Sequence, residues 1–179
     1  MPATTRLTTG LAVLATGLAL AACGTTTTTT AEGTAAPPCR TASLAWTLAK
    51  LGTERGTGRA QARLTAVNKG PGTCVFDGYP GLEIHNGKAE SIEGSGHGHP
   101  AAVALPAKAA VTVDLRYTPG GTNGAGDWCV RQREAVVRAP HDSRAAVVPV
   151  TDAHRKATAI DACGDTVSLA PLRRTPQGH

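Results

Sequence analysis

The sequence predicts an all-β domain, and three observations lead to this prediction. Short runs with apolar residues at every second position recur along the chain, as in 111–117, where Val111, Val113 and Leu115 would share one face. Clusters of Gly, Pro and Asn separate these runs at the spacing of a sandwich or a barrel. No segment shows a comparable 3.6-residue periodicity.

The chain begins with a segment typical of a lipoprotein signal peptide, residues 1–22. Its apolar stretch, 7–22, is shorter than the roughly 20 apolar residues that a membrane span requires. It ends in Leu20-Ala21-Ala22-Cys23, a lipobox, so we expect cleavage before Cys23 and a thioether-linked diacylglycerol on its sulfur. Ordinary secretory cleavage at an A-x-A-like site is the alternative, but it would leave Cys23 as an unpaired thiol.

This leader places the mature chain outside the cytoplasm, on the outer face of the cytoplasmic membrane. Two or three fatty chains on Cys23, such as palmitate, would make the attachment effectively permanent. Residues 24–38 are rich in Thr and Pro and lack large apolar side chains, so they predict a flexible tether. The tether would reach about 50 Å when extended and about 20 Å as a coil.

A single domain is expected at 39–172, followed by a loose polar tail at 173–179. Turn signals at 68–72, 86–87 and 119–121 separate the predicted strands. The strands are expected at 43–51, 63–67, 81–85, 101–105, 111–117, 130–137, 145–150 and 166–169. Aromatic residues make up only 3% of the chain, so Val, Leu, Ile and Ala must build most of the core.

Four cysteines remain once Cys23 is lipidated, an even set in an oxidising compartment, and they predict two disulfides. A hairpin of the first two predicted strands would place Cys39 beside Cys74. An up-down-up meander would likewise bring Cys129 beside Cys163. Each bridge closes a loop for which chain entropy gives roughly 3 to 4 kcal/mol.

With these features in place, the order of motifs resembles a family of actinobacterial secreted proteins catalogued as domain of unknown function 4232. The resemblance covers 39–172 and rests on 64–70, the Cys74–Gly81 block, Trp128-Cys129 and Cys163-Gly164. It implies a β-sandwich, often carried on lipoproteins, and it supplies no catalytic residues. We therefore expect a single Ig-like antiparallel β-sandwich stapled by two disulfides.

The charge of the mature chain is mildly basic, with 17 Lys and Arg (18 less one in the leader) against 13 Asp and Glu. The arginines are scattered among the predicted strands, and the expected compartment argues against nucleic acid. The expected partners are the membrane, through the lipid on Cys23, and envelope proteins or wall polymers. Attraction to anionic lipid or polymer would be weak and sensitive to salt.

His97-Gly98-His99 is the candidate metal site, because two imidazoles at i and i+2 can chelate one ion. Nearby residues that could add ligands are Glu83, His85, Glu90 and Glu93. We favour the alternative, a solvated glycine-rich loop, since the pair lacks a third ligand at a recognisable spacing. We expect neither a bound metal nor a cofactor.

The sequence offers no convincing catalytic constellation. His141-Asp142-Ser143 contains the residue types of a triad, but consecutive side chains cannot converge on one proton relay. We read Asp152 with His154, and Asp161 with Asp165, as solvated loop charges. The sequence therefore predicts a non-enzymatic binding or display module, with recognition loops at 86–100 and 118–128. A metal-binding lipoprotein and an envelope hydrolase are the alternatives.

Overall fold

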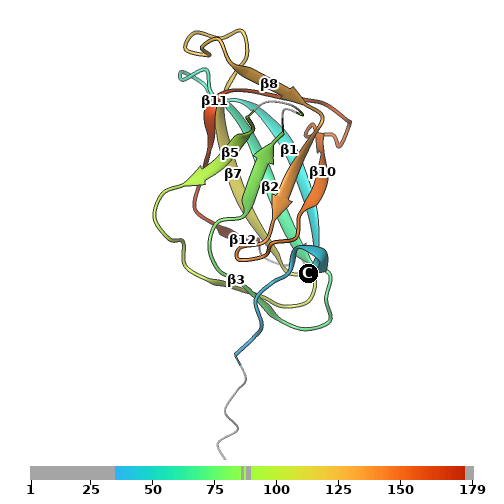
Figure 1. The fold of residues 1–179 in the computed structure, drawn as a ribbon. Coiled ribbons are helices and arrows are strands. Elements are labelled where there is room, and N and C mark those ends of the chain that lie inside the picture. Colours follow the sequence, from blue (N-terminus) through green and yellow to red (C-terminus); the bar gives the residue numbers. More distant parts are fainter. Residues whose placement is uncertain (1–34, 86, 88–89, 176–179) are drawn as a thin grey trace, which may run out of the picture. The chain divides into compact units, whose positions relative to one another are not determined.

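The computed structural model describes residues 35–85, 87 and 90–175 (Figure 1). In these residues the chain forms twelve strands, one short 3₁₀ helix, η1, and no α-helix. The elements are η1 (Thr41–Ser43), β1 (Leu44–Thr53), β2 (Ala60–Asn68), β3 (Cys74–Phe76), β4 (Gly81–Ile84), β5 (Ile92–Gly96), β6 (Val103–Leu105), β7 (Ala110–Pro119), β8 (Cys129–Gln132), β9 (Glu134–Arg138), β10 (Ala146–Thr151), β11 (Ile160–Leu169) and β12 (Arg173–Thr175). Cys23, the leader and most of the predicted tether lie outside the described residues.

Eight of the described strands form a closed β-barrel. Their order is β7-β2-β1-β10-β9-β4-β5-β11, and β11 pairs with β7 to close the ring. β8 and β12 extend the sheet by pairing with β11 and β7, while β3 and β6 form a separate two-stranded sheet. The prediction of an all-β fold is confirmed, but the prediction of an Ig-like sandwich is wrong, because the sheet closes on itself.

Two parallel pairings complete the ring, whereas the predicted sandwich was entirely antiparallel. β1 pairs with β10, and β5 pairs with β11, in parallel. β11 also changes partner along its length: 160–163 pair with β8, and 166–169 pair with β5. The change occurs at Gly164, whose φ of 87° lies in the left-handed region. Alternating strands with one apolar face suit a sandwich and a barrel equally, so the alternation could not distinguish them.

The interior is packed in two clusters. Inward-facing residues of the barrel strands, including Leu48, Leu64, Ile84 and Leu115, fill the barrel itself. A second cluster closes the end of the barrel at which β1 begins, and Phe76 and Leu105 of the β3–β6 sheet contribute to it. The barrel is therefore a packed core, with an apolar plug at one end.

The two disulfides are the predicted pairs, Cys39–Cys74 and Cys129–Cys163. The first joins the entering chain to β3 in the plug. The second joins β8 to β11, whose pairing places Cys129 directly opposite Cys163.

Three predicted segments differ from the structure. The strand expected at 130–137 is two strands, β8 and β9, and they pair with different partners. The recognition loop expected at 86–100 contains β5, which belongs to the barrel. The expected loose tail at 173–179 begins with β12. Within the part of the chain that the structure describes, no helix is long and apolar enough to cross a membrane.

Candidate functional site

The joint between β1 and β10, here called the seam, has the shortest parallel pairing in the barrel. The two strands are in register only at Leu48–Val150 and Ala49–Thr151. The backbone N–H of Val150 donates to the carbonyl of Arg133 on the β9 side, at 2.7 Å. Pro149, one residue earlier, therefore directs its nitrogen toward β1, where proline has no hydrogen to donate. Regular pairing is absent before Val150 for this reason.

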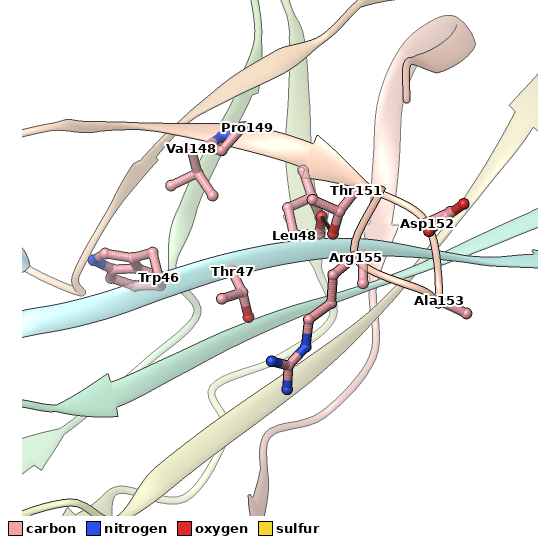
Figure 2. A pocket seen from close by; sticks show the side chains of 10 residues that line it. Trp46, Thr47, Leu48, Val148, Pro149, Thr151, Asp152, Ala153 and Arg155 are labelled. Atoms are coloured by element: carbon pink, nitrogen blue, oxygen red, sulfur yellow. Dashed lines mark hydrogen bonds between the residues drawn. The ribbon is translucent and has the colours of Figure 1, made fainter. Parts of the chain in front are cut away.

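A pocket of about 470 Å³ lies at the seam (Figure 2). Trp46 and Leu48 from β1 and Val148 and Pro149 from β10 line it. Leu48 and Val148 are buried in the core, so Trp46 and Pro149 supply the accessible apolar surface. Asp152, Ala153 and Arg155, from the turn after β10, line it as well. Its volume falls within the roughly 300 to 1,000 Å³ of small-molecule sites.

Trp46 is held in a fixed position beside this pocket. Its indole Nε1–H donates to the carbonyl of Thr41 at 3.2 Å. Its ring lies 6.2 Å from that of Phe76, centroid to centroid, at an interplanar angle of 58°. The side chain is half-buried between the two core clusters and still contributes to the pocket. A rigid aromatic ring at a pocket offers contact area at little entropic cost.

The turn 152–156 places a cation at the same pocket. The Asp152 carboxylate accepts the backbone N–H groups of Lys156 at 2.9 Å and His154 at 2.8 Å. These bonds, that of Lys156 foremost, lower the pKa of Asp152. The turn holds Arg155 at a φ of 62°, in the left-handed region. Its exposed side chain extends toward Thr47 (Figure 2) and forms no ion pair within the described residues.

The structure does not bring His97 and His99 together with a third ligand within the described residues. His99 Nε2 lies 3.1 Å from Asp77 Oδ1, and the carbonyl of His97 accepts the hydroxyl of Tyr79 at 3.1 Å. His85 instead contacts Glu83 on β4. Among the described residues no group of three or more His, Cys, Asp or Glu could hold a metal ion.

Glu83, His85 and Ser91 form a cluster that the sequence analysis did not identify, because β5 was not predicted. Ser91 Oγ donates to Glu83 Oε1 at 2.9 Å, and His85 Nδ1 lies 3.0 Å from both of those oxygens. The Ser91 hydroxyl, and then His85 and the charge of Arg138, lower the pKa of Glu83. A triad needs the serine and the acid on opposite ring nitrogens. Here both contact Nδ1, so the geometry is not that of a nucleophilic triad.

Asp142, from the triad-like run His141-Asp142-Ser143, has a structural role. Its carboxylate accepts the backbone N–H of Thr41 at 2.7 Å and that of Arg144 at 3.2 Å. These bonds, that of Thr41 first, lower the pKa of Asp142. The Thr41 hydroxyl accepts the backbone N–H of Ala139 in turn, at 2.8 Å. Together these bonds tie η1 to the connection between β9 and β10.

Residues 39–173 match a family described as a domain of unknown function (DUF4232). The chain belongs to this family. The DUF4232 match contains both disulfides and every barrel strand, and it ends at the first residue of β12. No curated protein and no solved structure matches the chain. In this chain the DUF4232 domain is thus a closed barrel with a pocket at its β1–β10 seam.

Proposed function

We propose that the protein is an extracytoplasmic lipoprotein, anchored through Cys23, whose DUF4232 barrel is a non-enzymatic binding module. The lipobox supports the location. The observation that carries the binding role is the seam pocket, where Trp46 and Pro149 offer apolar surface beside the guanidinium of Arg155, which forms no ion pair within the described residues.

This lining favours a small ligand with an apolar group and an anionic group. The apolar group would cover the side chains of Trp46 and Pro149, and the anion would accept hydrogen bonds from Arg155. A planar guanidinium binds carboxylates and similar anions through two parallel bonds. Apolar pockets with a few placed polar groups are the usual form of small-molecule sites.

The geometry of the polar clusters supports binding over catalysis. Nucleophilic chemistry requires a hydroxyl held against a free base, with a third group orienting that base. In the Glu83–His85–Ser91 cluster the serine donates its hydrogen to the carboxylate instead. Metal binding through His97 and His99 is likewise not favoured, since His99 Nε2 bonds Asp77 and no third ligand joins the pair within the described residues.

The proposal is tested with 1-anilinonaphthalene-8-sulfonate (ANS), which carries an apolar ring system and one anionic group. The chain from Gly24 to His179 is suitable, because it lacks the leader and retains both cores and both disulfides. We expect saturable binding of ANS. Arg155→Gln should raise the dissociation constant about tenfold, which corresponds to the loss of one charge-assisted hydrogen bond. Thr47→Trp, which adds bulk at the pocket, should also weaken ANS binding.

Lys156→Gln is the matched control, because it removes the same charge from the neighbouring residue, which does not line the pocket. Its dissociation constant should equal that of the unmodified chain. Equal ANS affinity in the Arg155, Thr47 and Lys156 variants would exclude the seam as the ligand site.

A further inference from the structure

The entering chain is fixed at one end of the barrel. The backbone N–H of Cys39 donates to the carbonyl of Val75 at 2.9 Å, and that of Val75 donates to the carbonyl of Pro37 at 2.8 Å. The chain before Pro37 therefore leaves from this end, which lies at the bottom of Figure 1. We call it the tether end. It comprises residues 35–43, 68–80, 96–109, 138–146 and 169–175.

Charge is distributed unequally between the two ends of the barrel. The tether end carries seven Lys and Arg against two acids, Asp77 and Asp142. The opposite end, residues 53–60, 117–134 and 151–165, carries six Lys and Arg against six Asp and Glu. The mild positive charge of the chain is thus concentrated where the chain enters.

Few acids at the tether end neutralise this charge. The Asp142 carboxylate accepts backbone N–H groups and interacts electrostatically with Arg40, and Asp77 contacts His99. Arg138 pairs with Glu83, its Nη2 lying 3.6 Å from Oε2. The remaining six cations are exposed and form no ion pair within the described residues; they are Arg40, Lys69, Lys108, Arg144, Arg173 and Arg174.

Two of these cations, Lys69 and Lys108, lie on backbone that hydrogen bonds hold in place. The side-chain amide of Asn68, a buried residue, donates to the carbonyls of Gly72 and Leu105, at 2.8 Å each. The adjacent Lys69 N–H donates to the carbonyl of Ser43, and the Lys108 N–H donates to that of Asn68. A surface whose charges are already positioned loses little conformational freedom when it binds.

We propose that the tether end binds the surface of an anionic phospholipid membrane. Each basic residue near such a surface contributes about 1 kcal/mol, and the attraction fades within a Debye length of about 8 Å. A membrane is favoured over a soluble polymer because this end is the one from which the chain runs toward Cys23. The proposal depends on the proposed anchoring for its biological setting, but vesicle binding by the barrel does not require the lipid.

The test measures cosedimentation of the Gly24–His179 chain with vesicles of phosphatidylcholine, with and without phosphatidylglycerol. Replacing Arg40, Lys69 and Arg144 together by Gln should lower the partition coefficient for the anionic vesicles about 100-fold. The control replaces Arg55, Arg131 and Arg133 by Gln. This control variant loses the same net charge from the opposite end, and its partition coefficient for the anionic vesicles should change little.

Two results would overturn the proposal. Equal losses in the two triple variants would show that net charge alone governs binding. The variant with Arg40, Lys69 and Arg144 replaced could bind anionic vesicles as the unmodified chain does and yet lose binding to soluble poly(glycerol phosphate). That result would assign the surface to a wall polymer. Thermal unfolding confirms that both variants are folded. ANS titration separates the two proposals, because the seam pocket contains none of the six substituted residues.

Discussion

Tyr117 has the largest of the fully buried side chains among the described residues, and its hydroxyl has no hydrogen-bond partner there. The residue is 1% exposed. Burial, with a smaller contribution from the charge of Asp161, raises the pKa of Tyr117 to about 12. Burying a hydroxyl that has no hydrogen-bond partner destabilises the folded state, whereas burying the aromatic ring alone does not.

Tyr117→Phe should therefore raise the free energy of unfolding by about 1 kcal/mol, measured by urea denaturation. Tyr79→Phe is the comparison, because the Tyr79 hydroxyl donates to the carbonyl of His97 at 3.1 Å. That change should lower the free energy of unfolding by about 1 kcal/mol. A loss of stability in Tyr117→Phe would mean that its hydroxyl has a partner in solution.

The same residue predicts a dependence on alkaline pH. Unfolded tyrosine titrates near pH 10, below the folded value of about 12. Between these values the unfolded chain binds fewer protons than the folded one, so stability falls as pH rises. We expect the stability advantage of Tyr117→Phe to widen over this range. A constant difference between the two proteins would contradict the raised pKa of Tyr117.

At the scale of elements, β5 shows how glycine can be required within a strand. A Cβ built on Gly96 would lie 2.3 Å from Cε2 of Tyr79, and one on Gly94 would lie 2.9 Å from Cβ of Leu82. These glycines leave room for larger side chains to pack over the strand. They also interrupt the apolar alternation, which is why the sequence analysis assigned 86–100 to a loop.

Gly96→Ala should lower the free energy of unfolding by about 1 to 3 kcal/mol, because the Tyr79 ring must move. Gly72→Ala is the matched control, since a Cβ there meets nothing within 4 Å. Urea denaturation of the two variants measures the difference. Equal stabilities would mean that β5 does not hold Tyr79 in this position.

One residue of the sequence also indicated the interrupted pairing at the seam. Pro149 falls within the strand expected at 145–150, and proline inside a strand is typical of an edge or an interrupted pairing. Arg155 had no such signal, because its left-handed backbone follows from the bonds that Asp152 accepts. The pocket therefore could not be assembled before the pairing of β1 with β10 was known.

For the whole molecule, the composition and the alternation predicted an all-β domain, and the order of cysteines predicted both disulfides. The hairpin that predicted Cys39–Cys74 is present as β1 and β2, so local reasoning was sufficient for that bridge. Cys129–Cys163 is also the predicted pair, but the predicted meander is wrong, because β8 pairs directly with β11. Closure of the barrel depends on β1 meeting β10, about 100 residues later in the chain. The concentration of charge at the tether end could not be predicted from the sequence either, since the residues of this end come from five separate segments.

Attachment at Cys23 is the prediction that concerns the whole protein in the cell. Cys23→Ala should move the protein from the membrane fraction to the soluble fraction, because the substituted residue has no sulfur to acylate. Intact-mass measurement of the unsubstituted protein should give a chain that begins at Cys23 and carries lipid. An unmodified Cys23 within a longer chain would refute the anchoring.

The Cys39–Cys74 bond also determines how the domain bears mechanical load. β1 and β2 lie entirely between these two cysteines, within the loop that the bond closes. Tension applied through the chain before Cys39 passes across the sulfurs to Cys74 and then into β3. The β1–β2 hairpin is shielded from that tension, so a pull on the chain before Cys39 cannot peel these two strands from the barrel while the bond is intact.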